Sequence, residues 1–264
     1  MGRSSTDNSH AEWLRTQEET WKIRAADYAK LDWVGKQDFI DQMIEFCEPQ
    51  PQWKALDVGT GPGIIAAAVR PRVAEVIGID LAPEMTKQAV ERHGHVSHLS
   101  FVVGNVEELN FPDDTFDLVT ARMVFHHVGD CPLGVSEVWR VLKPGSRFVL
   151  CDGVPPDHLT RSRYEQIFAL KEKRHTFSEA ELINLFDRAN FEDILVKPYF
   201  MRKVSLNDWL HKGALEPPVI AEIRRLHVEA DDHFKRVYRL TERNGDVLMD
   251  WKFIMIRGRK PLGV

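Results

Sequence analysis

A glycine-rich turn between an apolar run and a helical segment constrains the fold more than any other feature of this chain. Residues 55–58 form a short apolar run with an acid, Asp57, in its middle, and glycine then occupies every second position, at Gly59, Gly61 and Gly63. This pattern is typical of a buried strand that turns sharply into a helix. Glycine lets the backbone approach a ligand where a Cβ would clash, and the first N–H groups of a helix are free to bind it. The turn therefore predicts a small, polar and partly apolar ligand.

Strand-like and helical segments then alternate along the chain. The strand-like segments are residues 54–58, 75–80, 100–103, 116–121 and 147–152, and the helical segments are residues 64–69, 83–93 and 133–142, with a turn at 143–145. Such alternation favours right-handed crossovers and a parallel sheet that helices cover on both faces. We therefore predict an α/β fold with a Rossmann-like, doubly wound sheet that is mostly parallel, with an antiparallel last strand.

The segments on either side of this core have a different rhythm. Residues 1–10 are polar and are predicted to be disordered, and two helices are expected after them; helices at 161–173 and 178–189 follow the core. The last two strands, at 191–198 and 247–256, are separated by an insert that holds a short helix at 206–211 and a long polar helix at about 218–238. This insert is too long for a simple loop, so we interpret it as a cap or as a contact in a homodimer.

These observations predict three parts. They are an N-terminal helical lid at residues 1–48, a Rossmann-like domain at 49–200 and 246–264, and a helical insert at 201–245. The two helices expected in the lid are at 11–30 and 36–47.

The composition excludes several classes of protein. Hydrophobic residues make up 43% and charged residues 28%, which is ordinary for a globular protein with a full core. The net charge of −5 gives no basic excess for a nucleic-acid partner. No apolar stretch approaches the roughly 18 residues of a membrane span, and the N-terminus lacks the apolar core of a signal peptide. Three scattered cysteines, Cys47, Cys131 and Cys151, fit a reducing cytoplasm better than a disulfide framework.

Polar residues follow the predicted strands, at the edge where open parallel sheets bind ligands. Asp80 ends the second strand, where a carboxylate can accept hydrogen bonds from both hydroxyls of a ribose. Asn105 follows the third strand, His126 and His127 follow the fourth, and Asp152 ends the fifth. The glycine spacing is G-x-G-x-G and not the G-x-G-x-x-G that suits a pyrophosphate. A nucleoside with an amino-acid tail is therefore a better prediction than a nicotinamide dinucleotide.

Six segments together carry a family resemblance. Residues 56–63, 78–85, 104–113, 116–119, 125–128 and 141–145 resemble the class I S-adenosylmethionine-dependent methyltransferases. The similarity is greatest to the branch that resembles enzymes of ubiquinone and menaquinone biosynthesis and methylates small molecules. The resemblance implies S-adenosylmethionine as the cofactor and a small, fairly apolar metabolite as the methyl acceptor. The atom that receives the methyl group can be carbon, oxygen or nitrogen.

The resemblance also implies a role for individual residues. Asp57 would hold the amino group of the cofactor, Asp80 its ribose, and Asn105 the edge of its adenine. The family usually has aspartate at the position of Asn105, but an amide oxygen can still accept a hydrogen bond from the exocyclic amine. The full set of implied cofactor residues is Asp57, Gly59, Thr60, Gly61, Gly63, Asp80, Leu81, Met85, Asn105, Val106 and Arg122.

The catalytic and substrate residues are harder to derive, because methyl transfer needs a base only if the acceptor must lose a proton. His126 and His127 are our candidates for a base or a substrate contact, since imidazole titrates near neutral pH. The alternative is that they pack against the next helix. Asp152 is expected either to hold polar groups of the substrate or to cap a turn.

The aromatic residues Trp13, Trp21 and Tyr28 are predicted to line the substrate site as a lid, with plain helix packing as the alternative. His93, His95 and His98 are interpreted as a solvated loop, so no metal site is predicted.

Two other functions remain compatible with these patterns. The same cofactor fold can serve other chemistry, such as decarboxylation, cyclisation or dehalogenation. It can also belong to a binding protein that has no catalytic activity.

Overall fold

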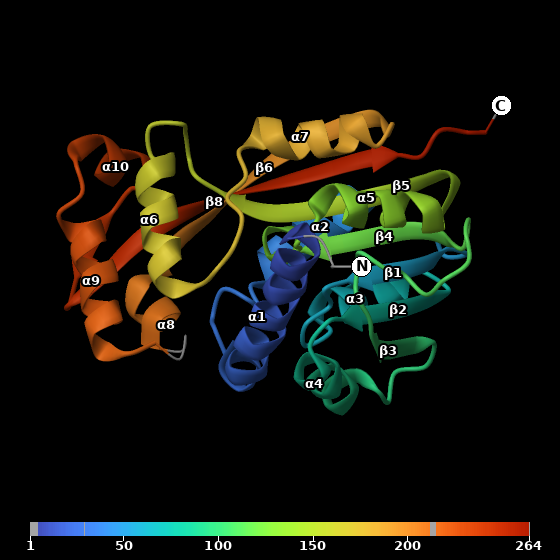
Figure 1. Cartoon of the computed structure of the whole chain (residues 1–264), viewed down its shortest axis with the longest axis horizontal. Coiled ribbons are helices and arrows are strands. Elements are labelled where there is room, and N and C mark those ends of the chain that lie inside the picture. Colours follow the sequence, from blue (N-terminus) through green and yellow to red (C-terminus); the bar gives the residue numbers. More distant parts are fainter. Residues whose placement is uncertain (1–4, 29, 212–214, 264) are drawn as a thin grey trace.

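The computed structural model describes residues 5–28, 30–211 and 215–263. They form one eight-stranded sheet with helices around it (Figure 1). The first five strands in the sheet are parallel to one another, and β8 is antiparallel to both of its long neighbours. This is the predicted Rossmann-like arrangement with an antiparallel last strand. The order across the sheet is β3 (Leu99–Val103), β2 (Glu75–Asp80), β1 (Lys54–Val58), β4 (Phe116–Arg122), β5 (Leu142–Val154), β8 (Asp246–Arg259) and β6 (Glu192–Ser205), with β7 (Thr241–Arg243) paired to β8.

Helices cover both faces of the sheet, as the alternation of segments predicts. One face packs against α2 (Gln37–Cys47), α3 (Ile64–Val69) and α4 (Pro83–His93), and the other against α5 (Cys131–Val141) and α7 (Glu179–Arg188). A buried apolar cluster fills each of the two interfaces. Two short 3-10 turns, η1 (Arg70–Arg72) and η2 (Phe125–His127), complete this part of the chain.

The turn from β1 into α3 has the conformation that its glycines favour. Gly59, Gly61 and Gly63 have φ angles of +61°, +53° and +81°, in the left-handed region where a side chain is strained. The carboxylate of Asp80 accepts a hydrogen bond from the backbone N–H of Gly61 at 2.8 Å. The end of β2 therefore holds the turn that follows β1.

The long strands β6 and β8 extend beyond the rest of the sheet and carry a helical cap (left in Figure 1). The cap consists of α6 (Arg161–Lys171), α8 (Leu206–His211), α9 (Pro217–Val228) and α10 (Asp232–Val237). Its side chains form a separate apolar cluster with the starting residues of β8. The predicted strands at 191–198 and 247–256 are therefore too short, because they omit the parts of β6 and β8 that support the cap.

Two local predictions are wrong, and one element was not predicted. The predicted long helix at 218–238 divides into α9 and α10, because the side chain of Asp231 caps α10 by accepting a hydrogen bond from the N–H of Phe234 at 2.9 Å. The hairpin of β7 and β8 was not predicted, although Asn244 and Gly245 form the asparagine-glycine pair typical of such turns and both have positive φ. The predicted turn at 143–145 lies within β5, where the pairing with β4 shifts register.

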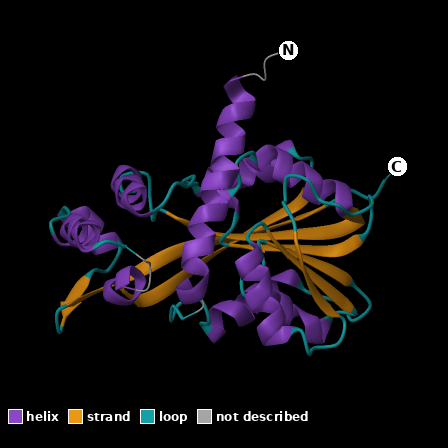
Figure 2. Cartoon of the chain, turned by 60° about the horizontal axis from the view of Figure 1, so that its bottom comes forward, coloured by secondary structure: helices purple, strands orange, loops and turns teal. Residues whose placement is uncertain are grey.

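The N-terminal segment is helical and not disordered from Ser5 onward. Helix α1 (Ser5–Tyr28) packs against α4 and crosses the molecule as its longest helix (Figure 2). Residues 1–4, which were included in the disorder prediction, lie outside the described residues. No helix in the described ranges is both long and apolar enough to cross a membrane.

Candidate active site

A cavity lies at the carboxyl ends of β1, β2 and β4, at the edge of the sheet that the sequence indicates. We call it the cofactor cavity. Ten of the eleven predicted cofactor residues line it: Asp57, Gly59, Thr60, Gly61, Asp80, Leu81, Met85, Asn105, Val106 and Arg122. The exception is Gly63, where an added Cβ would lie 2.8 Å from the ring of Phe101, so this glycine serves the packing of the turn.

Two carboxylates stand in this cavity, and both are held by local hydrogen bonds. Asp57 accepts from the hydroxyls of Thr60 and Thr120, each at 2.7 Å. Asp80 accepts from the backbone N–H groups of Gly61 at 2.8 Å and Ala82 at 3.0 Å. Burial raises the pKa of each of these two aspartates to about 6. Both are therefore mostly ionised at neutral pH and can accept further hydrogen bonds from a ligand.

The remaining polar residues of the cofactor cavity also have internal partners. The side-chain oxygen of Asn105 accepts a hydrogen bond from the N–H of Glu107 at 3.0 Å. Arg122 donates to the carbonyl of Val34 at 3.0 Å, and its guanidinium lies over the ring of Phe39. Glu107, which sequence reasoning did not single out, is buried and accepts from the N–H groups of Gly129 and Asp130. It holds the loop after η2 beside the cavity.

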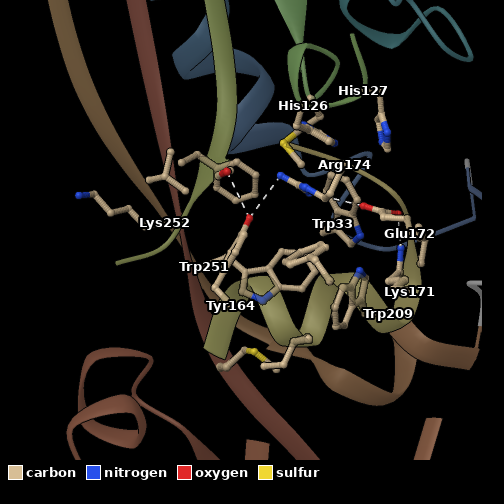
Figure 3. Close-up of a pocket in the computed structure, with 18 of the residues that line it drawn as sticks. Trp33, His126, His127, Tyr164, Lys171, Glu172, Arg174, Trp209, Trp251 and Lys252 are labelled. Carbon is tan, nitrogen blue, oxygen red and sulfur yellow. Dashed lines mark hydrogen bonds and ion pairs between the residues drawn. The ribbon is translucent and has the colours of Figure 1, made fainter. Parts of the chain in front are cut away.

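A second cavity adjoins the first (Figure 3). We call it the acceptor cavity, because the sequence leads us to expect a methyl acceptor beside the cofactor. Trp21, Tyr28, Met123 and His127 line both cavities and form their common wall. Burial raises the pKa of Tyr28 to about 12, so its hydroxyl stays protonated at that wall. Aromatic side chains dominate the rest of the lining: Trp33, Tyr164, Phe168, Trp209, Tyr238, Trp251 and Phe253.

His126 and Asp152 form a buried pair at the edge of the acceptor cavity. The Nδ1 atom of His126 lies 2.5 Å from a carboxylate oxygen of Asp152, and His126 lines the cavity. Asp152 also accepts from the backbone N–H groups of His126 and Gly153, and it lines neither cavity. Asp152 therefore holds the imidazole of His126 in place from the side that faces away from the cavities. Burial lowers the pKa of both His126 and His127, so their imidazoles are neutral near pH 7.

Helix α1 closes both cavities. Trp21 and Tyr28 belong to the common wall, and Trp21 meets the ring of His127 edge-on at 5.1 Å. Trp13 lines neither cavity; its indole N–H donates to the carbonyl of His127 at 2.8 Å, and its ring stacks on His175. Trp13 therefore anchors the helix beside the site, while the other two aromatic residues line the cavities.

The sequence did not indicate the charged residues of the acceptor cavity. The carboxylate of Glu172 lies 2.5 Å from Arg24, 3.0 Å from Lys171 and 3.5 Å from Arg174. None of these four residues belongs to one of the sequence motifs described above, and Arg24 is far from the other three in the sequence. Their side chains are between 2% and 11% exposed, so the group is buried.

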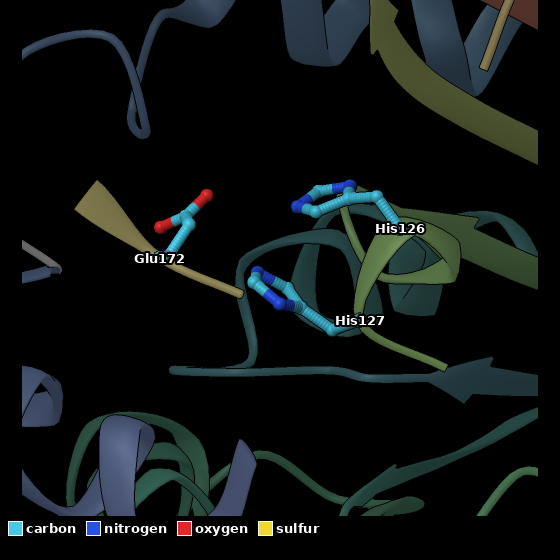
Figure 4. Close-up of side chains that lie close together, drawn as sticks. All are labelled: His126, His127 and Glu172. Carbon is cyan, nitrogen blue, oxygen red and sulfur yellow. The ribbon is translucent and has the colours of Figure 1, made fainter. Parts of the chain in front are cut away.

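Potential metal ligands also meet here. His126, His127 and Glu172 each offer a ligand atom within 4.8 Å of the others, and the two imidazoles point toward the carboxylate (Figure 4). Although burial alone would raise it, the neighbouring cations hold the pKa of Glu172 well below its usual range. A divalent metal would face the same cations of Arg24, Lys171 and Arg174, which disfavours a metal in this group. Of the three histidines that were interpreted as a solvated loop, His95 and His98 are exposed.

Comparison with known proteins agrees with this geometry. A methyltransferase-domain family model matches residues 56–150. The uncharacterized methyltransferase YcgJ of Bacillus subtilis is 29% identical over 83% of this chain and 88% of its own length. Its crystal structure superposes with a TM-score of 0.77 over 85% of this chain and 98% of its own. The demethylmenaquinone methyltransferase of Anoxybacillus flavithermus is 32% identical over 55% of this chain and 73% of its own length.

This chain belongs to the class I S-adenosylmethionine-dependent methyltransferases. Its relatives place it near the ubiquinone/menaquinone-type branch, and the chain spans about half of the length of several other enzymes of that type. A phosphoethanolamine N-methyltransferase of Haemonchus contortus in complex with S-adenosyl-L-methionine shares the fold at 18% identity, with a TM-score of 0.58 over 85% of this chain and 52% of its own. The cofactor of the present methyltransferase is S-adenosylmethionine.

Two glycines of the turn in this methyltransferase have different surroundings. A Cβ built at Gly61 meets no atom within 4 Å, which means that the backbone there faces open space in the cofactor cavity. A Cβ at Gly59 would instead lie 2.2 Å from Cγ2 of Val124. An added side chain would therefore enter the cofactor cavity at Gly61 and would collide with the protein at Gly59.

Alanine substitutions at these glycines are expected to separate folding from cofactor binding. Both positions have positive φ, so alanine at either costs about 1–2 kcal/mol of stability. We expect Gly59→Ala to lose a further ~1–3 kcal/mol because Val124 must move. We expect Gly61→Ala to weaken S-adenosylmethionine binding more than stability, because its methyl group enters the cofactor cavity. Thermal unfolding and calorimetric titration measure the two effects, and equal losses of stability in both variants would contradict the assignment.

Proposed function

We propose that the methyltransferase transfers a methyl group to a small, flat and largely apolar molecule in the acceptor cavity. The observation that carries the proposal is the common wall between an aromatic cavity and the cofactor cavity. Flat rings pack well against aromatic side chains. The relative from Anoxybacillus flavithermus is named for demethylmenaquinone, and this supports a quinone-like ring among the candidate acceptors.

The cofactor residues have separable roles in this proposal. Asp80 accepts hydrogen bonds from the ribose, and Leu81 and Met85 pack on the adenine, whose edge meets Asn105 and Val106. The glycine turn and Asp57 hold the methionine part, with Thr60 fixing the carboxylate of Asp57. When bound, S-adenosylmethionine supplies an activated methyl group on a sulfonium centre. Arg122 lines only the cofactor cavity of the two, so we assign its guanidinium to the cofactor and not to the acceptor.

The protein contributes mainly by positioning and by excluding water. Positioning of two reactants can supply about 7–11 kcal/mol of the barrier. Trp21 and Tyr28 hold the acceptor at the common wall, and α1 closes over it. His126 acts as the base when the acceptor must lose a proton, because Asp152 holds its Nδ1 and leaves Nε2 for the acceptor. His127 orients the acceptor at the wall.

A titration followed by product analysis tests the proposal. S-adenosylmethionine is expected to bind in a calorimetric titration, and ring compounds with hydroxyl groups are expected to gain the mass of one methyl group in place of a hydrogen. Fragmentation of the product assigns carbon, oxygen or nitrogen as the methylated atom. Absence of cofactor binding at millimolar concentration would reject the proposal.

Two other outcomes correspond to the alternative functions. Cofactor-dependent conversion of a compound without a mass gain would indicate decarboxylation, cyclisation or similar chemistry. Cofactor binding without conversion of any compound would favour a non-catalytic binding protein.

A further inference from the structure

The acceptor cavity carries more positive than negative charge. Arg24, Lys171 and Arg174 surround a single carboxylate, that of Glu172. The other buried carboxylate beside the cavity is Asp152, which is paired with His126. Because the imidazoles of His126 and His127 are neutral near pH 7, three basic side chains stand against two carboxylates. Burial lowers the pKa of Lys171, and the adjacent carboxylate of Glu172 opposes this decrease and favours the ammonium form.

The remaining charged residue in the lining does not change this balance. Lys252 lies 3.4 Å from Glu179, so its ammonium has an acidic partner of its own. Figure 3 shows Lys252 away from the group formed by Lys171, Glu172 and Arg174. The excess positive charge therefore belongs to the group around Glu172.

Neutral groups compensate this charge only in part. The ammonium of Lys171 lies 5.2 Å from the ring centre of Trp209, and the guanidinium of Arg174 lies 4.3 Å from that of Phe168. Arg174 also donates to the hydroxyl of Tyr164 at 3.4 Å. Ring faces attract cations, but a buried charge is normally balanced by a charge of opposite sign. The cavity is thus prepared for an anion.

The place of the excess charge relates it to the reaction. A carboxylate oxygen of Glu172 lies within 4.8 Å of a ring nitrogen of His127, and His127 belongs to the common wall. Glu172 is in direct contact with Lys171 and Arg174. A negative group held by these two cations therefore lies next to the wall across which the methyl group must pass.

We propose that the acceptor is a flat oxygen acid that binds as its monoanion, with the anionic oxygen against Lys171 and Arg174. This inference rests on the proposed methyl transfer and narrows its acceptor class. The electron pair of the anionic acceptor forms the new bond to the methyl carbon, and the carbon–sulfur bond breaks with its pair remaining on sulfur. The negative charge of the acceptor and the positive charge of the sulfonium cancel. The neutral product no longer balances the cavity, which favours its release.

A pair of matched probes tests this charge preference without turnover. The probes are 2-naphthoate and its neutral analogue 2-naphthamide, titrated by calorimetry at pH 7 in the presence of S-adenosylhomocysteine. We expect 2-naphthoate to bind at least tenfold more tightly. Equal affinity of the two probes, tighter binding of the amide, or binding of neither would overturn the proposal.

Substitution of Lys171 locates the effect. Lys171→Met keeps an unbranched side chain but removes the charge, and it is expected to weaken binding of 2-naphthoate about tenfold and that of 2-naphthamide less than twofold. Lys171→Arg should retain most of the preference. Arg24→Met provides a second variant that also removes one cation from the group. Lys22→Met, on the exposed side of α1, is the control and should change neither affinity.

A loss of affinity for both probes alike in Lys171→Met would overturn the assignment of the anion to this group. Failure of the proposed function is distinguishable, because it would appear as absent S-adenosylmethionine binding or absent methyl transfer. The probe experiment requires neither turnover nor knowledge of the natural acceptor.

Discussion

Replacing Asp80 by alanine is expected to weaken S-adenosylmethionine binding by roughly 1.5–3 kcal/mol, since hydrogen bonds to a charged group are lost. This corresponds to about a 10- to 150-fold increase in the dissociation constant. The same carboxylate also accepts from the N–H groups of Gly61 and Ala82, so the substitution frees the glycine turn as well. Calorimetric titration measures the affinity, and thermal unfolding measures the accompanying loss of stability.

Asp80→Asn is the matched control, because it retains one acceptor oxygen and the size of the side chain. We expect its loss of affinity to be smaller than that of Asp80→Ala. Unchanged affinity in the alanine variant would mean that the ribose lies elsewhere. The wild-type affinity should also fall as the pH decreases through about 6, because burial raises the pKa of Asp80 and Asp57 to that value and their protonated forms accept hydrogen bonds poorly.

Replacing both His126 and His127 by alanine is expected to lower turnover by about 100-fold or more, because His127 no longer orients the acceptor and His126 no longer accepts a proton that the acceptor must lose. Affinity for S-adenosylmethionine should change less than threefold, because no hydrogen bond from either imidazole reaches Asp57 or Asp80 in the described structure. Single-turnover rates and calorimetric titration separate the two quantities. Full activity of the double variant would return both residues to a packing role.

The pH profile tests whether His126 acts as the base. A base must be neutral, and burial lowers the pKa of His126 below the usual value for histidine. The rate should therefore persist as the pH falls through about 6.5 and decline only at lower pH. The charge of Asp152 opposes the lowering of the His126 pKa, and Asp152→Asn removes that charge. We therefore expect the variant to be slower and its rate to decline at a still lower pH than that of the wild type. An unchanged profile would mean that Asp152 does not act through His126.

Much of the cofactor site could be predicted from the sequence, because each of its parts is local. Alternate glycines at the end of a strand allow the tight, left-handed turn into the next helix. An acid at the end of the next parallel strand must lie beside that turn. The predicted bounds of β1, α3, β2 and α4 agree with the structure residue by residue. The asparagine-glycine pair at Asn244 was an equally local signal, and it was overlooked because the segment was treated as part of a helical insert.

The assignments of single residues to cofactor or substrate remain predictions, as do the division into three parts, the homodimer, the absence of a nucleic-acid partner and the cytoplasmic location. The structure places Trp13 and Asp152 outside the linings of both cavities, where they act on His127 and His126 respectively. Their roles are therefore those of positioning residues in the proposals above.

The sequence by itself determined the sheet and the glycine turn, because these depend on backbone geometry and on residues that are neighbours in the chain. Its resemblance to a known family supplied the identity of the methyl donor. Only the tertiary structure decided the acceptor cavity. Its charged group combines Arg24 of α1 with Glu172 and Arg174 after α6, and Trp251 of β8 lies in the same lining. No spacing rule connects such distant residues. They meet because α1, the segment after α6 and β8 all contribute to the lining of the same cavity, where their side chains are buried together.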